Sequence, residues 1–84
     1  MGLLIDSYGL REKMDELDIT TGWDEAVGPM IARHTMTVRL RKGRLNVRVD
    51  SAPLRHELTF MREALIEILN KRAGRRVVQE IVLE

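Results

Sequence analysis

Arginine and lysine side chains gather in one short stretch of this sequence and are its clearest candidates for chemistry: Arg39, Arg41, Lys42, Arg44 and Arg48. Guanidinium and ammonium groups bind phosphates and carboxylates through charge-assisted hydrogen bonds. No acidic residue lies between Glu25 and Asp50 to neutralise them within their own stretch. A cluster of this kind indicates contact with a polyanion rather than catalysis.

The residues around this cluster predict the element that positions it. From residue 36 to residue 50, apolar and polar side chains alternate on both sides of Lys42-Gly43, which is typical of a half-buried β-hairpin. Alternation sends successive side chains to opposite faces. The inner face is predicted to contain Met36, Val38, Leu40, Leu45, Val47 and Val49. The outer face is predicted to contain Thr37, Arg39, Arg41, Asn46, Arg48 and Asp50.

The net charge of +1 conceals two unlike halves. In residues 1–28, acidic residues clearly outnumber Arg11 and Lys13, whereas basic residues dominate residues 29–84. Such asymmetry favours a surface for nucleic acid or for an acidic partner. The alternative is that the arginines only solubilise an exposed sheet face.

Length and composition predict one globular domain spanning residues 1–84. The chain has 84 residues, is 44% hydrophobic and contains no cysteine, so neither disulfides nor cysteine-ligated zinc are expected. No apolar run approaches the roughly 20 residues of a membrane span, and no signal-peptide pattern precedes Asp6. We therefore expect a cytoplasmic protein without a membrane partner.

Helical periodicity flanks the hairpin. Leu3, Leu10, Met14 and Leu17 form one stripe, and Leu4 and Tyr8 a second, in one kinked helix or two short ones. Thr21-Gly-Trp-Asp24 fits a capping box that opens another helix, interrupted at Gly28-Pro29. That helix is predicted to place Trp23, Val27 and Ile31 on its inner side.

After the hairpin, Ser51 is predicted to cap the longest helix, which ends at Gly74. Its apolar arc contains Leu54, Leu58, Met61, Leu65, Ile68 and Leu69. Residues 77–83 then form a third strand. The order helix, helix, strand, strand, helix, strand predicts an α+β fold, with helices on one face of a small three-stranded mixed sheet. The basic face of the hairpin is then left uncovered.

Two further groups of residues are candidates for binding. Lys71, Arg72, Arg75 and Arg76 cluster where the long helix ends; they complement the helix dipole or form a second phosphate-contacting patch. A partner protein has other candidate contacts, on the acidic N-terminal helices and on the flanks of the long helix: Glu12, Asp15, Glu16, Asp18, Phe60 and Ile66.

No residue pattern indicates an enzyme, a cofactor or a metal. The two histidines, His34 and His56, are too few for a metal site, and His34 is expected to meet the terminal carbonyls of the second helix. Ser51 is better explained as a helix cap than as a nucleophile. Trp23 lies on the stripe of Val27 and Ile31, which favours a core anchor over a base-stacking role.

The ordered string Trp23-x₃-Val27-Gly28-x₂-Ile31-Ala32-x-His34-Thr35 resembles the DciA family of bacterial replicative-helicase operators, formerly a domain of unknown function. The similarity continues through Gly43-x-Leu45-x-Val47-x-Val49, then Leu54-x₂-Glu57-Leu58, then Leu65-x₃-Leu69-Asn70 and Gly74. Each piece is weak alone, since the second fits any hairpin. The ordered set is specific and covers most of the chain.

This resemblance implies a K-homology-like fold, binding of single- or double-stranded DNA, and assistance to the replicative helicase in DNA replication. RNA binding is a further alternative, as is a protein-interaction adaptor that does not touch nucleic acid; the oligomeric state is left open. Better-studied members are longer and have a basic tail, whereas this sequence stops at Glu84. The K-homology Gly-x-x-Gly phosphate loop is also missing. DNA binding is therefore better supported than helicase loading.

Overall fold

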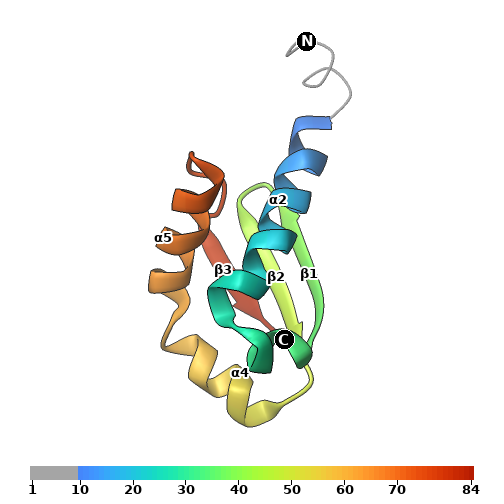
Figure 1. Cartoon of the computed structure of the whole chain (residues 1–84), viewed down its shortest axis with the longest axis vertical. Coiled ribbons are helices and arrows are strands. Elements are labelled where there is room, and N and C mark those ends of the chain that lie inside the picture. Colours follow the sequence, from blue (N-terminus) through green and yellow to red (C-terminus); the bar gives the residue numbers. More distant parts are fainter. Residues whose placement is uncertain (1–9) are drawn as a thin grey trace.

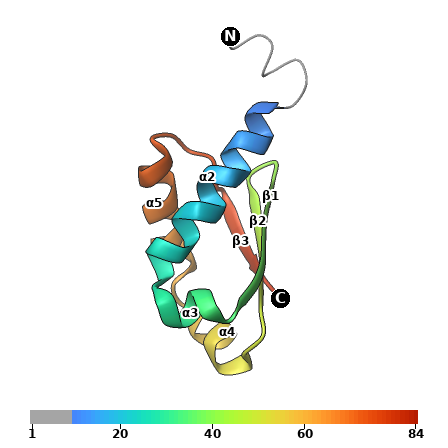
Figure 2. The ribbon, with the colours of Figure 1, turned by 45° about the vertical axis from the view of Figure 1, so that its right-hand side comes forward.

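Residues 10–84 are described in a computed structural model of the chain. Helix α2 (Leu10–Val27) and the short α3 (Pro29–Arg33) precede strands β1 (Thr35–Arg41) and β2 (Arg44–Val49). Helices α4 (Ala52–Thr59) and α5 (Arg62–Ala73) then lead to β3 (Glu80–Leu83). The sheet order is β1-β2-β3, with β1 antiparallel and β3 parallel to β2. Figures 1 and 2 show the helices on one side of this mixed sheet, which confirms the predicted α+β class. The arrangement also fits the K-homology-like prediction.

The predicted hairpin is present. Lys42 and Gly43 both have positive φ, 48° and 82°, as a two-residue turn of type I′ requires. Strand β1 pairs with β2 from Arg41↔Arg44 to Val38↔Val47 in the register that the alternation predicts. The inner side chains Leu40, Leu45, Val47 and Val49 are buried.

Met36 does not lie on the inner face as predicted; its side chain is 59% exposed. The register shifts there, because Thr35 pairs with Val49 whereas Thr37 pairs with Arg48. β1 has one extra residue here, which makes a β-bulge. Residues on the N-terminal side of the bulge therefore lie on the opposite face from the one that the alternation predicts. Thr35 takes the inward position in place of Met36.

Helix α2 is continuous, so the predicted capping box at Thr21-Gly-Trp-Asp24 is wrong. Gly22 lies inside the helix at the point where α5 crosses it, and a Cβ there would stand 3.2 Å from Arg72 Nε. The glycine therefore permits a close approach of two helices rather than a turn. The predicted interruption at Gly28-Pro29 is confirmed, with Gly28 at φ 88° and Pro29 opening α3. Leu3, Leu4 and Tyr8 of the predicted stripes lie outside the described residues.

The predicted long helix is two helices. Ser51 caps the first as predicted, since its hydroxyl accepts from the Leu54 N–H at 3.4 Å. The helix breaks at Phe60 and Met61, whose N–H groups donate to Glu57 and Leu58, three residues back. A tightened turn of this kind redirects the chain. As a result α4 lies below the end of the sheet and α5 runs beside α2 (Figure 1).

Strand β3 is shorter than predicted. Val77 and Val78 lie outside it because Asn70 engages their backbone: Oδ1 accepts from both N–H groups, at 2.9 and 2.8 Å, and Nδ2 donates to the Val78 carbonyl. The predicted helix end at Gly74 is confirmed by its left-handed conformation.

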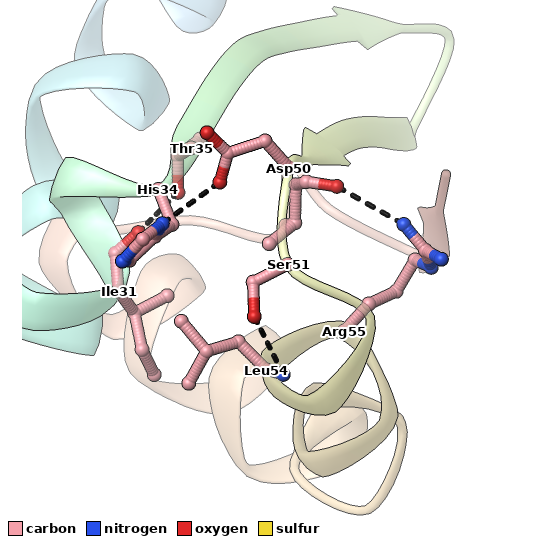
Figure 3. A network of polar contacts seen from close by, with 8 residues as sticks. Ile31, His34, Thr35, Asp50, Ser51, Leu54 and Arg55 are labelled. Carbon is pink, nitrogen blue, oxygen red and sulfur yellow. Dashed lines mark hydrogen bonds and ion pairs between the residues drawn. The ribbon is translucent and has the colours of Figure 1, made fainter.

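Trp23 anchors the core. Its side chain is fully buried, and its indole N–H donates to Thr35 Oγ1 at 3.1 Å. The Thr35 hydroxyl in turn donates to the Ile31 carbonyl at 2.8 Å (Figure 3). A buried indole with its N–H satisfied is a structural group, as predicted. The remaining core comes from every layer: Ile19, Leu40, Leu45, Val47, Val49, Leu58, Leu65, Leu69, Val78 and Ile81.

Candidate nucleic-acid interface

The outer face of the hairpin contains four arginines: Arg39, Arg41, Arg44 and Arg48. Arg41 and Arg44 lie directly opposite each other beside the turn. Arg39 pairs with Asn46, and Arg48 pairs with Thr37, so Arg39 and Arg48 are diagonal neighbours across the two strands. All four are exposed. Together they form a continuous basic surface, which we call the arginine face, and Lys42 lies at its end.

Two of these arginines are partly neutralised from the edges of the face. Arg39 Nε donates to Glu16 Oε2 of α2 at 3.0 Å, and Arg44 Nε donates to Glu80 Oε2 of β3 at 3.2 Å. Both arginine side chains remain about three-fifths exposed, at 62% and 60%. They can therefore still meet a ligand from the solvent side.

Arg41 and Arg48 differ from that pair. Among residues 10–84, no ion pair holds either side chain. Their charge is therefore uncompensated by a direct acidic neighbour in the part of the chain that the structure describes. At these two positions the positive charge of the face is therefore least offset by ion pairs within residues 10–84.

Glu16 closes the edge of the sheet as well as pairing with Arg39. β1 is an outer strand, and the Leu40 N–H that points away from β2 donates to Glu16 Oε2 at 3.0 Å. This backbone hydrogen bond is the main reason that the pKa of the Glu16 carboxyl lies below its ordinary value, and Arg39 lowers that pKa further. The carboxylate is therefore held in its ionised form.

The second predicted patch is divided. Arg72 forms an ion pair with Glu25, and Arg75 forms one with Asp15, so both basic side chains attach α5 to α2. Lys71 and Arg76 are exposed, and no ion pair holds them within residues 10–84. Half of the cluster is thus used in holding two helices together.

The predicted partner-binding residues also separate. Asp15 and Glu16 are only 16% and 14% exposed, and both are engaged by arginines of this chain. The side chain of Glu12 lies outside the described part of the structure. Ile66 packs against the core, whereas Phe60 is 78% exposed at the α4–α5 corner. The Phe60 ring meets the His56 ring edge-on at 5.1 Å.

A polar network at the open end of the hairpin was not predicted from the sequence (Figure 3). His34 Nδ1 contacts Asp50 Oδ1 at 2.8 Å, and Arg55 Nη1 donates to the Val49 carbonyl at 3.0 Å. The expectation that the His34 ring meets helix carbonyls is wrong; its backbone N–H does so at Ile31. Asp50 is the nearer partner because the register beyond the bulge pairs Thr35 with Val49, and this places residue 34 beside residue 50. The network depends on the bulge, so the alternation in the sequence did not reveal it.

The described residues contain no group of three or more His, Asp or Glu side chains placed to hold a metal ion. Within residues 10–84 no helix has the length and apolar character needed to cross a membrane.

Comparison with known proteins identifies relatives of the chain. A "UPF0232 protein" of Corynebacterium glutamicum (strain R) is 25% identical over 63 residues, which cover 75% of this chain and 35% of that protein. The chain therefore corresponds to about a third of the length of this relative. The family described as "Dna[CI] antecedent, DciA" matches residues 1–83. Because the match covers nearly the whole sequence, the chain belongs to the DciA family.

Proposed function

We propose that the chain is a non-enzymatic nucleic-acid-binding module that binds DNA through its arginine face. The observation that carries the proposal is the placement of four outward arginines on the side of the sheet that the helices leave open (Figure 2). Phosphate groups along a strand present regularly spaced negative charge, and an exposed row of guanidinium groups complements it.

The chemistry of the face favours binding without sequence selection. Arginine contacts to phosphate position a protein on nucleic acid but do not read bases. No aromatic side chain lies among the outward residues of β1 and β2 to stack on a base. Affinity should therefore be dominated by counterion release and fall steeply with salt.

The family role supplies the second part of the proposal, which is that the module assists the replicative helicase during DNA replication. Among the predicted partner contacts, Phe60 is the best placed to meet another protein, because it is exposed at a corner of the fold. Asp15 and Glu16 would first have to leave Arg75 and Arg39. A contact centred on one exposed side chain is small, so we expect a weak and transient complex.

The experiment compares two double variants of equal charge. R41A/R48A removes the two uncompensated guanidinium groups of the face, and R33A/R62A removes two exposed arginines outside it. Binding of single-stranded DNA, duplex DNA and RNA is measured against salt. We expect R41A/R48A to lower the slope of log K against log salt by about 0.9 per lost duplex contact, or about 0.7 on single strands.

R33A/R62A should change the slope little. Equal losses in both variants would contradict a defined face and leave only non-specific attraction to a basic protein. No binding by the natural chain would favour the adaptor alternative. Retention of the helicase by the natural chain but not by F60A, with or without DNA, would test the partner contact separately.

A further inference from the structure

Helix α2 has an apolar stripe on the side that faces away from the core. Leu10, Met14 and Leu17 are 46%, 51% and 59% exposed, whereas Ile19 and Trp23 of the same helix are buried. At about 100° per residue, the three exposed side chains fall within an arc of about 60°. That arc is roughly opposite the direction of Ile19 and Trp23. Within one chain, residues 10–84 therefore leave this stripe exposed.

The spacing of the stripe is that of a helix pair. Steps of four and then three residues, from Leu10 to Met14 to Leu17, place apolar side chains along one seam, as in coiled coils. Thr21 stands at the next position of the series. The spacing thus favours another α-helix as the occupant, rather than a flat surface.

The charges beside the stripe indicate which helix fits. On one flank, Arg11 precedes Asp18 by seven residues; on the other flank lie Lys13 and Thr20. If a second copy of α2 packs antiparallel, with Met14 against Leu17 of the other copy, Arg11 of each copy lies opposite Asp18 of its neighbour. Because a two-fold axis relates the two copies, this pair of opposite charges occurs twice in the dimer. Antiparallel packing also opposes the two helix dipoles.

We propose that the outer stripe of α2 binds the same stripe of a second copy of this chain, in an antiparallel helix pair. The interface closes on itself and forms a dimer. A three-residue seam falls short of the roughly 1,200 Å² that stable complexes bury, so the dimer should be weak and concentration-dependent.

The layers of the fold give this dimer a consequence that rests on the proposed function. The stripe is on the side of α2 opposite the buried Ile19 and Trp23, and the arginine face is the outer face of the hairpin. Figure 2 shows α2 on the helix side of the sheet, with the other side of the sheet open. Pairing through α2 therefore places two arginine faces back to back, pointing outward in opposite directions. Such a dimer would bridge two segments of nucleic acid rather than bind one segment with both faces.

Molar mass in solution tests the self-association without reference to nucleic acid. The natural chain, L10Q/L17Q and the control M30Q/F60Q are compared by sedimentation from a few micromolar to several hundred micromolar. The control also replaces two exposed apolar residues, at 66% and 78% exposure, but elsewhere in the fold. We expect the natural chain and the control to dimerise as concentration rises, and the dimer of L10Q/L17Q to weaken at least tenfold.

Circular dichroism should show that all three are folded, because the replaced side chains are exposed and glutamine is a good helix former. A monomeric natural chain at every concentration would overturn the proposal, and would mean that the stripe is covered by residues preceding Leu10 or by a different protein. Equal weakening in M30Q/F60Q would overturn it too.

Orientation is tested with engineered disulfides, which the absence of natural cysteine makes simple. In the antiparallel pair Leu10 lies beside Thr21 of the other copy, whereas the two Leu10 positions are about 16 Å apart along the helix axis. A mixture of L10C and T21C should therefore form a mixed disulfide, and L10C alone should not. Cross-linking of L10C with itself would instead establish a parallel pair and refute the antiparallel one. Bridging of two labelled duplexes, lost in L10Q/L17Q, then tests the consequence for DNA.

Discussion

Val47 and Arg48 are neighbours in β2, and their side chains lie on opposite faces of the sheet. Val47 is fully buried among core side chains, whereas Arg48 is exposed on the arginine face. Val47 contributes to stability through burial of apolar surface, whereas the charge of Arg48 acts on its surroundings through long-range electrostatics. Alternate positions of one strand are therefore under unrelated constraints. We therefore expect substitutions at inward positions to change stability, and substitutions at outward positions to change binding.

The sharpest test of this difference is to place the same charge on each face. V47D buries a carboxylate without a partner, so we expect loss of the cooperative unfolding transition. R48D should leave the domain folded and weaken DNA binding more than an alanine substitution would. Thermal unfolding followed by circular dichroism checks both. A folded, cooperative V47D would show that the inner face tolerates charge and that the comparison fails.

The inner face is also tested through Trp23, which packs beneath it. W23A should lower the free energy of unfolding by about 3–5 kcal/mol, a large part of the total for a domain of this size. W23F should cost less because most of the volume is kept, although the Thr35 hydroxyl loses its indole donor. Fluorescence of the natural chain should change little on adding oligonucleotide. Strong quenching would indicate that the indole reaches the ligand.

The bulge at Met36 allows a finer test of the two faces. M36K should change stability by less than about 0.5 kcal/mol, because the side chain is already exposed. V38K should cost more, since Val38 is partly buried against the core. Chemical denaturation measures both. If M36K proved as costly as V38K, the alternation would continue unbroken through residue 36, contrary to the shifted register.

Glu16 contacts residues of both faces, because its carboxylate accepts from the outward Arg39 side chain and from the N–H of the inward Leu40. The pKa of this carboxyl is lower in the folded chain than its ordinary 4.5, so its contribution to stability is full above that value. The contribution is lost as pH falls through the folded pKa. E16Q should therefore cost about 1 kcal/mol or less at neutral pH and flatten the acid side of the stability profile. D24N serves as the control on an exposed carboxylate.

E16Q should also raise DNA affinity slightly, because it releases Arg39 and removes a negative charge beside the face. Unchanged affinity, together with an unchanged acid profile, would mean that Glu16 does not restrain Arg39 in solution.

The hairpin and its two faces could be predicted from the sequence because alternation is a local signal. Leu40 and Leu45 face inward, and Arg39 and Arg41 face outward. The alternation of apolar and polar residues next to each of them is enough to predict these orientations. The bulge at Met36 has no such local signal. It depends on Thr35 turning inward to meet Trp23, twelve residues away in the sequence.

The helices were harder to predict because their boundaries depend on tertiary contacts. Gly22 has the sequence character of a turn, yet it serves the crossing of α2 and α5. The ion pairs of Arg39 with Glu16 and of Arg75 with Asp15 join distant segments, so no spacing rule reveals them. These pairs decide which basic residues of the candidate site remain uncompensated.

The outer edge of β1 has a further consequence, for solubility. Exposed edge strands offer unpaired N–H and C=O groups on which other chains can build open-ended sheets. Here the bulge at Met36 disrupts one end of that edge, and the Glu16 carboxylate occupies the Leu40 N–H near the other. Only a short middle stretch remains for an intruding strand. The carboxylate that restrains an arginine therefore also blocks part of the β1 edge against pairing with another chain.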